Sequence, residues 1–193
     1  SVSPDGQLVL GGMQDNGTDV FNHPEFPGQW VNFFGGDGSY TAFNPIDEFL
    51  YVSAQNGYIA RIDRNLQYTV LADRLREEAL DRDEFMFITP FVLNPDNPST
   101  VCVGGKRLLR GNFDGLSWNR ASSTFGNTFY DMANALAAAS GGTAVLVGTG
   151  NAIYRIASGD AATQATVPNE TTPRQGWVSS LTFDPGNPDV AYA

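Results

Sequence analysis

The sequence predicts an all-β protein built from a repeated unit of about 40 to 50 residues. First, five segments share one pattern: an apolar stretch, a turn rich in Pro, Asp, Asn or Gly, and an alternating stretch that ends in small residues. Second, glycine accounts for 21 of the 193 residues and charged residues for only 17%, which suits short strands and tight turns. Third, the apolar positions alternate, as in half-buried strands. A four-stranded repeat of this length predicts a β-propeller with antiparallel blades.

The five copies of the repeat read SVSPDGQLVLGG, AFNPIDEFLYVSA, VLNPDNPSTVCVGG, ALAAASGGTAVLVGTG and TFDPGNPDVAYA. A proline marks the turn in four of them, and residues 140–142, Ser-Gly-Gly, take its place in the other. The first and last copies are the same part of the repeat, so a closed four-blade ring would leave one copy redundant. We therefore expect an incomplete ring, which the remaining blades of a longer parent chain would complete.

We expect one propeller segment over residues 1–193. Its expected units are a partial blade at 1–33, blades at 34–71, 87–120 and 129–167, and the start of a further blade at 178–193. Residues 72–86 overlap the charged stretch LADRLREEALDRDEF and are expected as a solvated helical or loop insertion.

Within each blade, the first strand ends at the repeat's turn. First strands are expected at residues 40–43, 89–93, 131–136 and 178–183. Second strands follow, for example at 50–53 and 101–103, and third strands after a hairpin, for example at 58–62 and 153–156. The fourth strand carries an aromatic residue: Trp30, Tyr68 or Trp118.

The apolar residues of the first two strands predict the core between blades. Cys102, the only cysteine, lies in the apolar run TVCVGG, so we expect a buried thiol and no disulfide. The other expected core residues are Phe43, Tyr51, Val92, Val101, Val103, Leu136, Val145, Val147, Leu181 and Phe183.

Charge and composition exclude several functions. The net charge is −10 and the basic residues form no stripe, which argues against nucleic acid and an anionic membrane surface as partners. No apolar run is long enough to span a bilayer, so no membrane insertion is expected. His23 is the only histidine, which argues against a zinc site of the usual ligand types and against a Ser-His-Asp triad.

Two Asn-Gly pairs, in QDNG and QNG, follow second strands of the repeat. Asn-Gly is the strongest short hairpin signal, because both central positions of the turn need a positive φ. We therefore expect Asn16–Gly17 and Asn56–Gly57 to form hairpin turns rather than sites. The hairpin interpretation does not explain Asp15, an additional acid that the shorter hairpin at Gln55 lacks.

The chain resembles secreted bacterial propellers with BNR or Asp-box repeats. The resemblance is carried by four stretches: GGMQDNGT, GGDGSYTAFNP, TPFVLNPDNPSTVCVGGKRLLRG and WVSSLTFDPGNPDVAYA. These propellers are similar in appearance to sialidases, the sortilin ectodomain, xyloglucanases and photosystem II assembly factors. The resemblance implies an extracellular or periplasmic location. It also implies that Asp-boxes stabilise the turn between third and fourth strands, away from the ligand face.

The Asp-box pattern, Ser-x-Asp-x-Gly-x-Thr-Trp, is degraded in this chain. RIDRNLQY keeps Asp63, places Asn65 at the glycine position, where a positive φ is expected, and replaces the tryptophan by Tyr68. GNFDGLSW keeps Asp114, Gly115, Ser117 and Trp118, but it lacks one residue of the spacing between Asp114 and the tryptophan. We expect Asp114, Gly115 and Trp118 to be structural.

The hairpins between second and third strands share a face with the loops that lead from one blade to the next. Asp37, in FGGDGSY, is a candidate ligand for calcium or a sugar hydroxyl, with a simple turn former as the alternative. No other cofactor is expected. The ligand-binding candidates on this face are Asp15, Asn16, Asp37, Gln55, Asn56, Lys106 and Arg107.

Two functional interpretations remain open. The favoured one is a propeller module that binds a glycan or protein ligand through the loop-bearing face, without catalysis in this segment. The alternative is part of a glycoside hydrolase, xyloglucanase-like or sialidase-like, which would need two facing carboxylates about 5 to 10 Å apart. We expect Asp15 and Asp37 to lie on the same face, as the acidic members of any such site.

Overall fold

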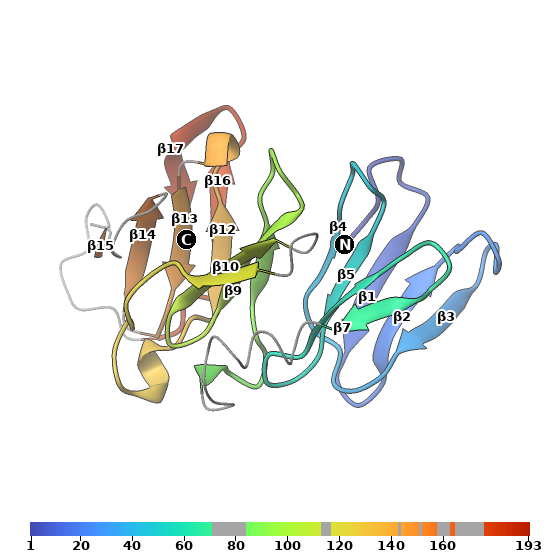
Figure 1. Cartoon of the computed structure of the whole chain (residues 1–193), viewed down its shortest axis with the longest axis horizontal. Coiled ribbons are helices and arrows are strands. Elements are labelled where there is room, and N and C mark those ends of the chain that lie inside the picture. The colour runs from blue at the N-terminus through green and yellow to red at the C-terminus, as the bar shows by residue number, and fades with distance from the viewer. Residues whose placement is uncertain (71–83, 113–116, 143, 151, 158–162, 165–175) are drawn as a thin grey trace.

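The computed structural model describes residues 1–70, 84–112, 117–142, 144–150, 152–157, 163–164 and 176–193. These residues form five antiparallel sheets that follow one another along the chain (Figure 1). The first sheet contains β1 (Val9–Met13), β2 (Gly17–Phe21) and β3 (Trp30–Phe34). The second contains β4 (Thr41–Phe43), β5 (Leu50–Ser53), β6 (Ile59–Ile62) and β7 (Tyr68–Val70).

The third sheet contains β8 (Phe91–Leu93), β9 (Thr100–Gly104), β10 (Leu108–Asn112) and β11 (Ser117–Arg120). The fourth contains β12 (Ala135–Ala138), β13 (Ala144–Gly148), β14 (Ile153–Ala157) and β15 (Thr163–Gln164). The fifth contains β16 (Thr182–Asp184) and β17 (Asn187–Tyr192). Two short 3₁₀ turns, η2 (Phe129–Asp131) and η3 (Ser140–Gly142), lie between strands of the described residues.

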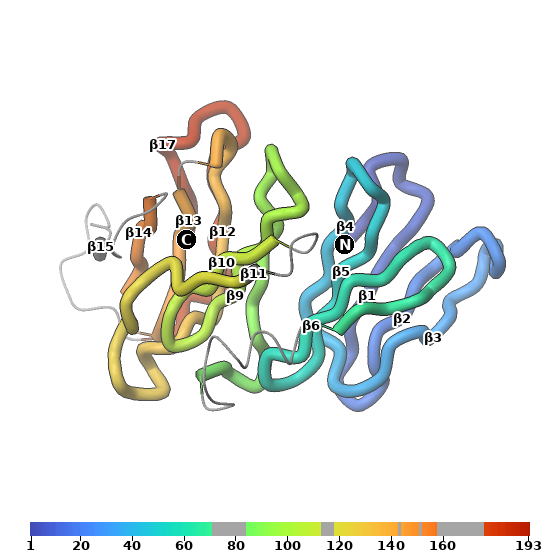
Figure 2. Tube along the Cα trace, in the orientation of Figure 1, coloured from blue at the N-terminus to red at the C-terminus, as the bar shows by residue number. Residues whose placement is uncertain are grey.

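The predicted β-propeller with four-stranded antiparallel blades is confirmed. In each four-stranded sheet the strands pair in chain order, so the first strand forms the inner edge and the last strand the outer edge. The inner strands β8, β12 and β16 contact one another in turn. No strand pairing joins the first sheet to the fifth among the described residues, so the described blades form an open series (Figure 2).

Apolar side chains fill the space between each pair of neighbouring sheets. Leu10 and Val20 of the first sheet pack with Val52 and Ile62 of the second. Three further clusters join the second sheet to the third, the third to the fourth and the fourth to the fifth. Because burial occurs between blades, each blade depends on its neighbours for its core.

Four predicted core residues are only half-buried, which corrects the prediction. They lie on the inner strands, and three of them line a hollow of about 310 Å³ beside the fifth sheet. The half-buried residues are Phe43, Val92, Leu136 and Phe183. The residues confirmed as buried are Tyr51, Val101, Cys102, Val103, Val145, Val147 and Leu181.

The strand predicted at residues 131–136 is wrong over its first four residues, because β12 begins only at Ala135. The carboxylate of Asp131 accepts hydrogen bonds from the backbone N–H and the hydroxyl of Thr128, at 2.9 and 2.7 Å. These bonds hold Phe129–Asp131 as a 3₁₀ turn instead of a strand.

The predicted insertion at residues 72–86 lies mostly outside the described residues. Of its described end, Phe85 is buried and packs between Gly57 of the second sheet and Gly105 of the third. This part of the segment therefore belongs to the core and is not solvated, which corrects the prediction.

The turns and connections of the chain lie on two opposite faces of the molecule. The turns between first and second strands lie along the upper edge of Figure 1, and the hairpins between second and third strands lie along the lower edge. The described connections from β3 to β4 and from β11 to β12, the second of which contains η2, also lie along the lower edge. We call this lower surface the loop-bearing face.

Cys102 should be inert in the folded protein. Burial raises the pKa of its thiol, and the nearby Arg110 opposes this shift only in part. Because the thiolate is the reactive form, we expect a thiol reagent to label Cys102 only after denaturation. Mass spectrometry of native and urea-treated protein checks this, and rapid labelling of the native protein would show the burial to be wrong.

Tyr40 should make the fold sensitive to alkali. Its hydroxyl donates a hydrogen bond to the carbonyl of Asn134 at 3.2 Å, and burial raises its pKa above the ordinary value. As pH rises through about 10, the unfolded chain therefore loses this proton first, and the free energy of unfolding falls. We expect Tyr40→Phe to lessen this fall, as measured by urea unfolding at about pH 8 and about pH 10.5. The exposed Tyr68→Phe is the control, and an unchanged pH dependence in Tyr40→Phe would contradict the assignment.

Candidate functional site

The first hairpin of the loop-bearing face differs from its prediction. Met13 pairs with Gly17, so the loop consists of three residues, and Asp15 takes the left-handed conformation with φ of 62°. Gly17, with φ of 77°, is already the first residue of β2. The prediction that Asn16–Gly17 fills the two central turn positions is therefore wrong, and the additional Asp15 is the residue that lengthens the loop.

The second hairpin has the predicted turn. Asn56 and Gly57 have φ of 57° and 76°, and the N–H of Tyr58 donates to the carbonyl of Gln55 at 3.3 Å. Two consecutive positive φ values are what a two-residue hairpin with matching twist requires. The Asn56–Gly57 prediction is confirmed.

A hydrogen-bonded chain joins these two hairpins through Asp37. The Asp37 carboxylate accepts the backbone N–H of Asp15 at 2.9 Å, and the Asp37 N–H donates to Oε1 of Gln55 at 2.8 Å. The structure thus brings Asp15, Asp37 and Gln55 together on the loop-bearing face. One Asp37 oxygen binds the Asp15 backbone, so the loop between the sheets is fixed to both hairpins.

Lys106 and Arg107 form the corresponding hairpin of the third sheet, and Glu84 holds both. The N–H of Lys106 donates to the Glu84 carbonyl at 2.8 Å, and Nε of Arg107 lies 3.3 Å from Oε2 of Glu84. Both side chains of the ion pair are largely buried. Arg107 therefore fastens the segment that carries Phe85 onto the blade.

The turn between β6 and β7 is organised by Asp63. One carboxylate oxygen accepts the N–H groups of Asn65 and Gln67, at 2.8 and 2.9 Å. Leu66 has the positive φ, 58°, so the prediction that Asn65 has a positive φ is wrong. The positive φ therefore lies one residue after the glycine position of the Asp-box pattern.

The aromatic residues of the two degraded boxes occupy different surroundings. Trp118 is buried against Gly111, whereas Tyr68 is exposed on the outer strand β7. The candidates Asp114 and Gly115 lie outside the described residues.

Three exposed rings meet on the loop-bearing face, and the sequence did not identify them as ligand-binding candidates. Phe129 and Tyr130 belong to η2 before β12, and Trp177 lies in the connection before β16. The ring of Trp177 lies 5.4 Å from each of the other two, stacked on Tyr130 and edge-on to Phe129. Their exposed fractions are 58%, 58% and 40% in chain order. We call these three residues the aromatic platform.

Gly150, in the hairpin between β13 and β14, supports the aromatic platform. Its N–H donates to the Tyr130 carbonyl at 2.9 Å. A Cβ at this position would lie 3.3 Å from the rings of both Trp177 and Tyr130. The small residue therefore lets both connections pack onto the hairpin, which holds the rings together although they are far apart in the sequence.

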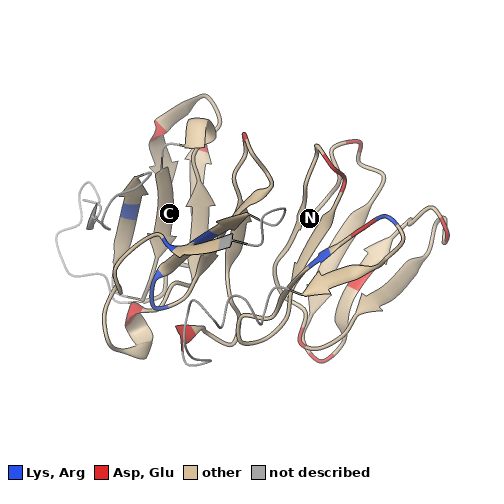
Figure 3. Ribbon diagram, viewed as in Figure 1, with Lys and Arg blue, Asp and Glu red and all other residues tan. Residues whose placement is uncertain are grey.

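This face also carries other exposed apolar residues and dispersed charge. Met13, Phe87 and Ile88 are also exposed on its hairpins and connections. Lysines and arginines are scattered over separate sheets (Figure 3). Within the described ranges, no three His, Cys, Asp or Glu side chains group together as ligands for a metal ion. Nor does any helix there have the length and apolar character to cross a membrane.

No protein-family model matches the sequence. No curated protein matches it either. Among solved structures, the chain is similar to the glycoside hydrolase family 74 enzyme of Niastella koreensis, with a TM-score of 0.70 and 19% sequence identity. The match covers 96% of this chain and 33% of that enzyme, so the chain spans about a third of its length. At this identity the similarity establishes the propeller fold, shared with a glycoside hydrolase.

Proposed function

We propose that this propeller segment binds a glycan through its loop-bearing face, with the aromatic platform as the main contact. The observation that supports this is the meeting of three exposed rings, Phe129, Tyr130 and Trp177. Exposed apolar groups gathered in one place mark interaction sites on soluble proteins. A pyranose has an apolar C–H face and a rim of hydroxyl groups, so it can stack on such rings while its rim stays hydrated.

The polar groups around the aromatic platform suit a glycan better than the apolar surface of a protein partner. Asn127 and Thr128 precede the rings and are exposed, so they can exchange hydrogen bonds with hydroxyl groups. We propose further that the protein acts outside the cytoplasm, and that the Asp63 turn is a degenerate Asp-box that supports the blade. The similarity in fold to a glycoside hydrolase agrees with a carbohydrate ligand but does not by itself assign one.

Glycoside hydrolysis is the second candidate, because the fold is shared with such an enzyme. It would need two carboxylates that face a sugar across about 5 to 10 Å. On this face, Asp37 binds the Asp15 backbone, Glu84 pairs with Arg107 and Asp131 binds Thr128. Because these three carboxylates are engaged within the protein, we rank hydrolysis second to binding.

A binding experiment with the aromatic platform removed tests the proposal. We expect the protein to be retarded in affinity electrophoresis by at least one of three neutral polysaccharides: xyloglucan, mixed-linkage β-glucan and mannan. The triple variant Phe129→Ala, Tyr130→Ala, Trp177→Ala should bind that polysaccharide at least tenfold more weakly, a loss of about 1.4 kcal/mol or more.

The matched control is Trp30→Ala, which removes an exposed indole from the outer strand β3. It should leave polysaccharide binding unchanged. Equal binding by the triple variant and the wild type, equal losses in the triple variant and the control, or no binding by the wild type would each refute the proposal. Release of reducing sugar by the wild-type protein would instead support the hydrolase candidate.

A further inference from the structure

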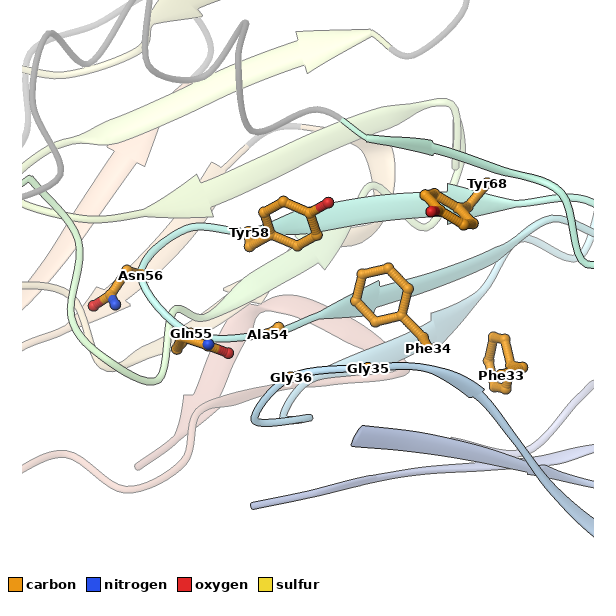
Figure 4. A pocket seen from close by; sticks show the side chains of 9 residues that line it. All are labelled: Phe33, Phe34, Gly35, Gly36, Ala54, Gln55, Asn56, Tyr58 and Tyr68. Carbon is orange, nitrogen blue, oxygen red and sulfur yellow. The ribbon is translucent and has the colours of Figure 1, made fainter. Parts of the chain in front are cut away.

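A groove separates the outer strands of the first and second sheets, away from the aromatic platform. It has a volume of about 530 Å³ and runs from the hairpin at Asn56 along β3 and β7 (Figure 4). This volume lies in the range of small-molecule sites, roughly 300 to 1,000 Å³. The described lining residues are Phe33, Phe34, Gly35, Gly36, Ala54, Gln55, Asn56, Tyr58 and Tyr68.

Three rings form the wall and floor of the groove. Phe34 is buried at its base, stacked on Tyr58 with ring centroids 5.8 Å apart. Tyr68 stands edge-on to Phe34 at 6.1 Å and is exposed. In Figure 4 these rings lie in the space between β3 and the strands β6 and β7. The groove therefore combines an apolar floor with two phenol groups.

Amide groups occupy the end of the groove near the loop-bearing face. The Oε1 atom of Gln55 accepts the N–H of Asp37 at 2.8 Å, so this bond fixes the side chain and the amide NH₂ group remains as its donor. Asn56 is exposed at the tip of the hairpin and adds a donor and an acceptor. A Cβ built on Gly35 would meet nothing within 4 Å, so the groove is open above this residue.

We propose that this groove is a second binding site, for a neutral oligosaccharide. The rings can stack on the apolar face of a sugar, while the phenol and amide groups exchange hydrogen bonds with its hydroxyls. The inference rests on the proposed function in its ligand class, but it assigns a different site. A glycan chain held here and on the aromatic platform would bind more tightly than at either site alone.

The charge of the site selects a neutral ligand. None of the described lining residues has a charged side chain, so an ionic ligand would lose hydration without gaining a counter-charge. The protein as a whole has a net charge of −10, which further disfavours acidic sugars. The proposal therefore distinguishes neutral oligosaccharides from uronic acid oligomers.

The test uses the triple variant that lacks the aromatic platform, so that only the groove is measured. Its binding to cellotetraose, mannotetraose and maltotetraose is followed by saturation-transfer NMR. Gly35→Val should narrow the groove at its lining without a clash in the protein, because the space around that Cβ is open. Gly11→Val is the matched control, because its Cβ also meets nothing within 4 Å and Gly11 does not line the groove.

We expect the triple variant to bind at least one of these tetrasaccharides, and Gly35→Val and Tyr68→Ala each to weaken that binding at least tenfold. Gly11→Val should leave it unchanged. Absence of binding, binding that Gly35→Val leaves intact, or tighter binding of tetragalacturonate or a polyproline peptide would overturn the proposal. These measurements use a protein that lacks the aromatic platform. The groove proposal can therefore fail while the proposed function of the aromatic platform holds, and the proposed function can fail while the groove proposal holds.

Discussion

Ile59→Ala should lower the free energy of unfolding by about 2 to 5 kcal/mol. Ile59 lies on β6 in the cluster between the second and third sheets, together with Tyr51, Phe85 and Trp118. Removing three carbon atoms from a closely packed cluster loses their burial and leaves a cavity that the rigid sheets close only in part. Urea denaturation followed by circular dichroism measures the change.

Ile46→Ala makes the same substitution at the turn between β4 and β5. Ile59 is 0% exposed and Ile46 is 73% exposed, so the pair differs mainly in burial. The Ile46 variant should stay within about 0.5 kcal/mol of the wild type. Equal losses in the two variants would show that the second and third sheets do not pack as described.

Gly38→Ala should destabilise the first two sheets by about 1 to 3 kcal/mol. Gly38 lies in the connection between β3 and β4, and its N–H donates to the Met13 carbonyl at 3.0 Å. A Cβ at Gly38 would overlap the Gly17 carbonyl and approach Thr18 Oγ1 to 2.7 Å. The carbonyl is backbone and cannot rotate away, so the connection must move and strain the neighbouring Asp37 contacts.

Gly35→Ala in the same connection is the control, because its Cβ meets nothing within 4 Å. We expect it to unfold at the same urea concentration as the wild type, while Gly38→Ala unfolds earlier. If both variants were neutral, the close contact between this connection and the first hairpin would be wrong.

The sequence was sufficient to predict the blades, because turn residues and alternating apolar residues act locally. Asn56–Gly57 folds as predicted, since its turn depends on two adjacent residues. The predictions failed where a distant group decides the conformation. The Asp37 carboxylate binds the Asp15 backbone across 22 positions, and this contact helps place the positive φ on Asp15.

The half-buried inner strands show a similar limit. Phe43 and Phe183 alternate with polar residues as core positions do, but their exposure depends on how the sheets are arranged around the inner edge. Periodicity identifies the inward side of a strand and does not say how completely a neighbouring blade covers it.

The candidate site was predictable only in part. The repeat register placed Asp15, Asp37 and Gln55 on one face, where their backbone and side-chain groups meet. The aromatic platform escaped notice because Tyr130 and Trp177 lie 47 positions apart, in connections of irregular structure. The signal that could have identified it was the pair Phe129–Tyr130 beside a polar stretch at a predicted blade connection, since adjacent exposed apolar residues mark interaction sites.

Hydrogen exchange of the amide groups, with and without the polysaccharide that binds, tests most directly whether the loop-bearing face is the ligand face. We expect bound polysaccharide to slow exchange in the connections that carry Tyr130 and Trp177. The turns on the opposite face, such as the one at Ile46, should exchange at the same rate in both samples. Protection confined to the turns of that opposite face would contradict the account.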